Sequence, residues 1–194
     1  INLLFGIPLI EAVMITVLDT FLLLFLINKG IRKMEAFIIV LVMIVGLSFV
    51  FEMIFAQPEM DKVLYGLIPS LPSESALYIA IGIIGATVMP HNLYLHSSLV
   101  QTRKFSRSDA GIKQALKYNF IDSAIALNLA FFVNAAILIL AAATFYKNGM
   151  HEVAEIQDAY RFLQPLLGTK WASILFAVAL IAAGQSSTIT GTLA

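Results

Sequence analysis

Residues 85 to 96 read GATVMPHNLYLH and combine a proline, a methionine and two histidines within an apolar stretch. Pro90 has no backbone N–H, so a helix that passes through it lacks the hydrogen bond to the carbonyl of Ala86, four residues earlier. Gly85 lowers the cost of an irregular backbone at the same place. In a regular helix Met89 would lie about 300° around from Ala86, on nearly the same side. The segment therefore predicts a broken helix that directs a carbonyl oxygen and a thioether sulfur to one face.

This oxygen and this sulfur could bind a metal ion together. Thioether sulfur favours softer transition ions, whereas carbonyl oxygen alone suits calcium or magnesium. Two structural interpretations stay open, because methionine is a common gap-filler in apolar cores and a neighbouring hydroxyl can satisfy a carbonyl that a proline kink frees. The residues by themselves indicate a functional break in the helix and leave its ligand undecided.

The two histidines of the segment call for a separate interpretation. His91 and His96 lie about 140° apart around a helix, which argues against one ion bound by both. Ionisable side chains inside a membrane are costly and usually face a polar pathway, and histidine titrates near physiological pH. One histidine that handles protons is the functional interpretation, and a neutral imidazole hydrogen-bonded between helices is the structural one.

Membrane helices must position these residues. The chain has 194 residues, of which 60% are hydrophobic and 12% charged, whereas soluble domains carry roughly 25% charged residues. Apolar runs of about 20 residues, each long enough to cross a bilayer, predict an all-α membrane protein with five spans, the third of them broken. The expected spans cover about 1–28, 36–56, 75–100, 122–146 and 171–194. Because both ends fall inside apolar runs, we expect one transmembrane region from a longer protein.

The charges of the connections predict how the spans are oriented. The connections 29–35 and 103–117 carry more basic than acidic residues, and the connection 57–74 carries more acidic ones. Basic residues in short loops mark the cytoplasmic side. The first, third and fifth spans are therefore expected to run from outside to inside.

The outer connection 147–170 contains a helical pattern. Its apolar residues recur at helical spacing between charged residues; they are Val153, Ile156, Tyr160 and Leu163. The pattern predicts a short amphipathic helix, either lying at the membrane interface or packed as an ordinary loop helix.

Four acidic residues lie in or near the expected spans. Glu11 and Asp19 lie deep in the first span, where a polar contact between helices is the leading interpretation and proton relay the second. Glu52 and Asp122 lie close to the ends of their spans. We therefore expect both of these carboxylates to be solvated.

The segment 86–97, ATVMPHNLYLHS, resembles the sixth transmembrane segment of the NRAMP family of proton-coupled divalent metal transporters. The run 183–192, AGQSSTITGT, is similar to that family's eighth segment. Together with the topology, the resemblance covers essentially the whole chain, as segments four to eight. It implies part of a LeuT-type fold of two inverted repeats, in which substrate binds where the first and sixth segments unwind.

The resemblance assigns the metal ligands to the helix break at Gly85 and Pro90. They are the backbone carbonyl of Ala86 and the sulfur of Met89. The family's first segment carries an Asp-Pro-Gly-Asn motif whose aspartate and asparagine complete the metal shell, and this sequence contains no such motif. The other ligands are therefore expected from the remaining segments of the same transporter.

Four further residues receive roles from the resemblance alone. His96 is implied in the proton pathway or in pH dependence, and His91 in structure or in tuning of the site. Thr87 and Asn134 are implied in gating or in completing the hydration shell of the ion.

The resemblance implies a secondary active transporter of manganese or iron(II), coupled to protons by alternating access. Its partners would be the metal substrate, protons and the lipid bilayer, with no cofactor and no nucleic acid, and a bacterial plasma membrane is the expected location. Two alternatives stay open: a LeuT-like carrier of a small organic solute, whose broken helix presents its dipole to a carboxylate, and a non-transporting membrane scaffold. An enzyme is not expected, because the sequence shows neither a nucleophile–base pair nor a closed set of catalytic metal ligands.

Overall fold

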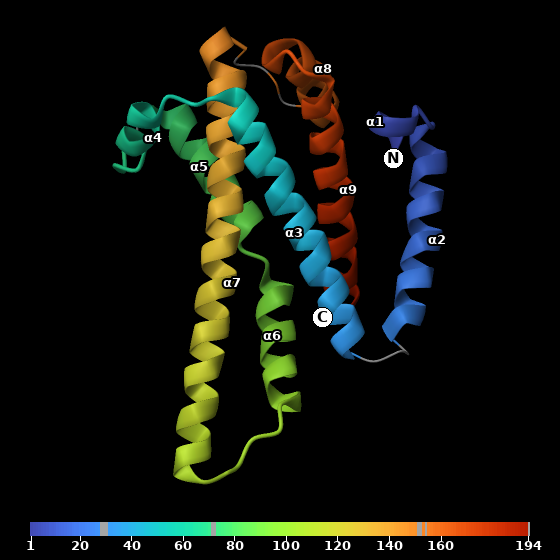
Figure 1. The fold of residues 1–194 in the computed structure, drawn as a ribbon, viewed down its shortest axis with the longest axis vertical. Coiled ribbons are helices and arrows are strands. Elements are labelled where there is room, and N and C mark those ends of the chain that lie inside the picture. The colour runs from blue at the N-terminus through green and yellow to red at the C-terminus, as the bar shows by residue number, and fades with distance from the viewer. Residues whose placement is uncertain (28–30, 71–72, 151–152, 154, 194) are drawn as a thin grey trace. The chain divides into compact units, whose positions relative to one another are not determined.

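The computed structural model describes residues 1–27, 31–70, 73–150, 153 and 155–193, and every regular element within these ranges is helical (Figure 1). The expected all-α class is confirmed. The helices are α1 (Asn2–Phe5), α2 (Leu9–Ile27), α3 (Ile31–Ala56), α4 (Met60–Gly66), α5 (Glu74–Thr87), α6 (Pro90–Thr102), α7 (Asp109–Thr144), the 3-10 turn η1 (Tyr146–Asn148), α8 (Ile156–Leu167) and α9 (Lys170–Leu193).

Several of these helices overlap the expected spans. Among the described residues, the segments Lys33–Ala56, Asp109–Asn148 and Lys170–Gly191 are long and apolar enough to cross a membrane. Two shorter apolar helices, Leu9–Leu18 and Glu74–Thr87, fall in the first and third expected spans. The 36 residues of α7 extend about 54 Å at 1.5 Å per residue, beyond the roughly 30 Å of a bilayer core. This helix therefore begins before its apolar run does.

The chain forms two compact units. Unit 1 comprises Ile1–Glu59 and Phe131–Ile189, and unit 2 comprises Met60–Ala130 and Thr190–Ala194. Unit 1 thus contains α1 to α3, the second part of α7, α8 and most of α9. Unit 2 contains α4, α5, α6 and the first part of α7.

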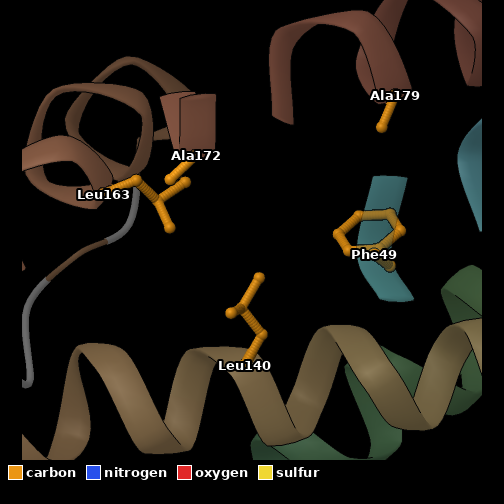
Figure 2. Packing of buried hydrophobic residues seen from close by; sticks show 5 residues of the cluster. All are labelled: Phe49, Leu140, Leu163, Ala172 and Ala179. Atoms are coloured by element: carbon orange, nitrogen blue, oxygen red, sulfur yellow. The ribbon is translucent and has the colours of Figure 1, made fainter. Parts of the chain in front are cut away.

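Unit 1 has a hydrophobic core to which several helices contribute. Buried side chains from α3, α7, α8 and α9 form one cluster (Figure 2); they are Phe49, Leu140, Leu163, Ala172 and Ala179. The two alanines are seven residues apart on α9, so they lie on nearly the same face of that helix. Burying a leucine or phenylalanine side chain stabilises a fold by about 1.5–3 kcal/mol, so this cluster holds α3, α7, α8 and α9 together within unit 1.

The helix expected in the connection 147–170 is α8 (Ile156–Leu167). It ends before Gly168, whose φ of 67° is the left-handed conformation that commonly closes a helix. Leu163 is 1% exposed and belongs to the core of unit 1. The Ser173 hydroxyl of α9 donates to the carbonyl of Tyr160 over 2.7 Å. These contacts support the interpretation of α8 as a packed loop helix.

The acidic residues have different environments from one another. Asp122 is exposed as expected, and its Oδ2 accepts from Nη2 of Arg103 at 2.9 Å. The expectation for Glu52 is wrong, because this side chain is 0% exposed. α3 continues for one turn beyond Glu52, and Glu52 lies on the face that packs into the core of unit 1. Glu11 is exposed, and the side chain of Asp19 lies outside the described part of the chain.

Candidate metal centre

The helix break lies between α5 and α6, both in unit 2 (Figure 1). α5 ends at Thr87, and the N–H of Val88 donates to the Ile84 carbonyl at 3.0 Å. Val88 is extended, with φ of −80° and ψ of 104°. Met89 is also extended, with φ of −103° and ψ of 99°. The predicted break is therefore confirmed, as an extended dipeptide between two helices.

Proline explains where the second helix starts. Pro90 is the first residue of α6, a position at which the backbone N–H has no partner within the helix and where the fixed φ of proline suits helix initiation. A residue before proline is also driven out of the helical region, which accounts for the extended backbone of Met89. Pro90 thus starts a new helix instead of kinking a continuous one.

The position of the break changes the geometry expected for the two candidate ligands. The sequence argument placed Ala86 and Met89 on one face of a regular helix. That arrangement is wrong, because the backbone leaves the helical conformation at Val88 before it reaches Met89. The two residues lie instead on either side of an extended turn, Ala86 in the last turn of α5 and Met89 at the N-cap of α6.

Both candidate ligands are accessible on unit 2. Ala86 is exposed, and Met89 is 42% exposed. The helical partner of the Ala86 carbonyl would be the N–H of residue 90, which proline lacks. The carbonyl end of a helix also carries a partial negative charge. The end of α5 therefore offers a backbone oxygen in a field that favours a cation, three residues before a thioether.

Two further residues at the break have defined surroundings. The Thr87 hydroxyl donates to the Ile83 carbonyl at 2.8 Å, so its oxygen is fixed against α5. Gly85 has no positive φ, and a Cβ built at this position would meet no described atom within 4 Å apart from its chain neighbours and the nearby backbone of its own helix. Crowding and backbone conformation therefore do not require glycine at residue 85, and the break is carried by Val88, Met89 and Pro90.

The other residues named by the resemblance are spread over both units. His96 lies on α6 in unit 2 and is exposed. His91 belongs to the first turn of α6, and its side chain lies outside the described part of the structure. Asn134 lies on α7 in unit 1 and is exposed. Ala86, Thr87 and Met89 thus lie near one another because they are close in the sequence.

The chemistry of the break differs from that of a carboxylate or imidazole centre. Within the described ranges, no group of three or more histidine, cysteine, aspartate or glutamate residues is placed to hold a metal ion. A metal ion at the break would meet neutral oxygen and sulfur donors from this chain. Such a donor pair suits a transition ion of intermediate softness better than calcium or magnesium.

Sequence reasoning missed one residue with functional potential. Both carboxyl oxygens of Glu52 are buried, and neither has a hydrogen-bond partner among the described residues. Sequence spacing places Ser48 and Glu52, four residues apart, on one face of α3 with Leu41, but it does not show that this face is covered. All three of these side chains are buried.

Comparison with known proteins shows to which family the chain is related. Residues 1–194 match the family model Nramp, described as natural resistance-associated macrophage protein-like. The chain belongs to the Nramp family. It is 54% identical over 197 residues to the divalent metal cation transporter MntH of Listeria welshimeri, covering 100% of this chain and 44% of the relative. It is 55% identical to the divalent metal cation transporter MntH of a Nostoc species, and this match covers 100% of this chain and 45% of the relative.

Solved structures agree with this assignment. The Nramp chain is similar to the manganese transporter of Eremococcus coleocola, with a TM-score of 0.86 and 40% identity, over 99% of this chain and 43% of that one. A structure of that transporter in complex with an aromatic bis-isothiourea substituted compound gives the same values. The expected LeuT-type transporter fold is thereby confirmed, and the chain is part of an integral membrane protein. It spans less than half the length of the relatives that it matches.

Proposed function

We propose that this Nramp chain is part of a secondary transporter that carries manganese or iron(II) across a bacterial plasma membrane. The observation that supports the proposal is the extended break at Val88 and Met89, which separates the last turn of α5, with the Ala86 carbonyl, from Met89 at the N-cap of α6. Relatives at 54% and 55% identity are named divalent metal cation transporters, and a structural neighbour is named a manganese transporter. The metal ion is the transported substrate in this proposal.

The two ligands would divide the work of recognition. The Ala86 carbonyl is a hard oxygen donor, and the partial negative charge at the end of α5 adds attraction for a cation. The Met89 sulfur is a soft donor, and ligand softness is one of the few properties that separate manganese and iron(II) from calcium and magnesium. We therefore assign affinity mainly to the oxygen and discrimination mainly to the sulfur.

Two neutral donors are not enough to hold a divalent ion inside a membrane. Removing a charge from water costs many kcal/mol unless opposite charge compensates it. The parts of the longer relatives that lie outside this chain would have to supply at least one carboxylate. This requirement makes the proposed site a shared one, completed by other segments of the same transporter.

The break also provides the motion that transport needs. In alternating access, one element moves against another around a substrate site near the middle of the membrane. Val88 and Met89 have extended backbone conformations between the two helices, so a change of their φ and ψ would reorient α6 against α5 while each helix stays intact. Thr87 and Asn134 would contribute neutral polar groups to gating or to the hydration shell of the ion.

Protons would drive this transport, as the second part of the proposal. His96 is an exposed imidazole on α6, six residues after Pro90, and intramembrane ionisable groups usually mark proton or ion pathways. We propose His96 for the proton pathway and His91 for tuning of the site. Neutral substitution at His96 is expected to weaken the dependence of metal uptake on pH.

Uptake into liposomes tests the function. The full-length transporter that contains this chain would be reconstituted and given manganese with or without an inward proton gradient. We expect uptake that rises with the gradient and that calcium does not share. Equal uptake of calcium and manganese would contradict the proposal. Binding of an amino acid without any response to manganese would favour the alternative, a carrier of an organic solute. Such a solute would bind at the N-terminus of α6, where no side chain caps the helix.

A further inference from the structure

Glu52 is an acidic residue enclosed in the core of unit 1. Its side chain is 0% exposed, and neither Oε1 nor Oε2 has a hydrogen-bond partner among the described residues. The break in unit 2 makes no use of this residue. A fully buried acid without a partner is uncommon, because buried polar groups are almost always hydrogen-bonded.

The residues next to Glu52 on α3 belong to the buried part of unit 1. Ser48 and Phe49, one turn earlier on α3, are 3% and 7% exposed. Met53 and Ala56, which follow Glu52, pack against the cluster that includes Leu140 and Leu163. The carboxyl group thus lies on a face of α3 that the other helices of unit 1 cover.

The charged groups on the neighbouring elements lie outside this core. Nζ of Lys147, just after α7, pairs with Oε1 of Glu59 at 2.9 Å, and these side chains are 60% and 45% exposed. The other charged residues described on α2, α3, α8 and α9 of unit 1 and at the N-cap of α8 are exposed or half-buried; they are Glu11, Lys33, Glu35, Glu155, Asp158, Arg161 and Lys170. Within the described ranges, no basic group forms an ion pair with Glu52.

This environment determines the charge of the carboxyl group. An isolated carboxylate taken out of water costs at least several kcal/mol even after the protein relaxes, a large part of the 5–15 kcal/mol that typically stabilises a fold. Because this chain alone encloses Glu52, a basic residue from elsewhere could reach it only if the helices of unit 1 moved apart. In the conformation described, Glu52 is therefore a neutral carboxylic acid.

We propose that Glu52 is a proton-binding site, closed to water in this conformation and able to exchange its proton with water when the core of unit 1 opens. On opening, water would reach the group, its O–H bond would break, the carboxylate would keep the electron pair and the proton would pass to water. This inference rests on the proposed function, because proton coupling needs a group that holds a proton in one conformation and releases it in another. It adds a site separate from the metal-binding break.

The position of Glu52 along α3 indicates the side of the membrane with which Glu52 would exchange its proton. The charge pattern of the connections predicts that α3 runs from inside to outside, and Glu52 lies one turn before its end at Ala56. α8 and the ion pair between Glu59 and Lys147 belong to the same expected outer side. Opening of this end of unit 1 would connect Glu52 with the outer solution.

Infrared difference spectroscopy on the detergent-purified full-length transporter tests the proposal. Spectra would be recorded between two pH values and with or without manganese, for the unmodified protein, Glu52→Gln and the control Glu35→Gln, which changes an exposed acid on the same helix. We expect a carbonyl stretch of a protonated carboxylic acid that shifts in deuterated water, changes with pH and with manganese, disappears in Glu52→Gln and persists in Glu35→Gln. The absence of a band that depends on Glu52, or a band that neither pH nor manganese alters, would overturn the proposal.

The same samples separate this proposal from the proposed function. Manganese binding would be measured on each sample. If the unmodified transporter binds no manganese, the proposed transport of manganese is contradicted. The infrared difference between the two pH values would still decide whether Glu52 binds a proton. If Glu52→Gln does not fold, Glu52→Met serves for the same spectral comparison. Methionine has a similar volume and leaves no unpaired polar atom in the core.

Discussion

Unit 1 and unit 2 differ in what they bury. In unit 1, residues from α3, α7, α8 and α9 enclose a shared cluster and one acid, Glu52. In unit 2, none of the described side chains is buried, and Ala86, Met89 and His96 are all exposed. The packing of this chain is therefore concentrated in one unit, whereas the residues proposed for metal binding lie in the other. A shared site, completed by further segments, is consistent with this division.

The largest effect is expected from truncating the core of unit 1. Leu163→Ala should lower the free energy of unfolding of the full-length transporter by about 2–5 kcal/mol, because it removes buried methyl groups and leaves a cavity. Leu116→Ala makes the same chemical change on α7 in unit 2, where the side chain is 65% exposed, and should cost less than about 1 kcal/mol. Reversible unfolding in detergent measures both, and equal losses would contradict the contrast between the units.

A close contact within unit 2 sharpens the comparison. A Cβ at Gly111 would overlap the carbonyl oxygen of Ser106, where the chain enters α7. Gly111→Ala should therefore destabilise the transporter by about 1–3 kcal/mol, the range found for overpacking. Gly82→Ala on α5 is the matched control, because its Cβ would meet open space, and it should be neutral or stabilise by up to about 1 kcal/mol. Thermal unfolding of both variants would test this, and a stable Gly111→Ala protein would refute the local crowding.

The smallest effects are expected from the surface ion pairs. Arg103 with Asp122 in unit 2 and Lys147 with Glu59 in unit 1 are each 2.9 Å apart and well exposed. Double-mutant cycles to alanine should give coupling energies of about 0.2–1 kcal/mol for both pairs, and less at high salt. A coupling above about 2 kcal/mol between Lys147 and Glu59 would show that unit 1 is held by charge as well as by the apolar cluster.

The sequence predicted the break but not its form. The missing N–H of Pro90 is compatible with a kinked helix and with the start of a new one, and sequence spacing does not distinguish the two. The start of α7 at Asp109 could not be taken from hydrophobicity either, because a helix can extend through polar residues before it reaches its apolar run. The sequence therefore located the candidate site and left its geometry to the structure.

Glu52 shows a different limit of sequence reasoning. Its position close to the end of the apolar run suggested that the carboxylate is solvated. However, α8 belongs to the same core as the neighbouring Phe49, although α8 follows about 100 residues later in the chain. Burial that depends on a distant segment is not contained in local spacing. Ligands from other segments of the transporter are hidden from this sequence for a similar reason.

Calorimetric titration of manganese, and separately of calcium, into the full-length transporter tests the central claim most directly. The account predicts that manganese binds and calcium does not, and that Met89→Ala weakens manganese binding at least tenfold, about 1.4 kcal/mol, with loss of the preference over calcium. Met43→Ala, an exposed methionine on α3, should leave both titrations unchanged. If neither ion binds, or if Met89→Ala keeps the preference for manganese, the break at Met89 is not a metal site selected by sulfur.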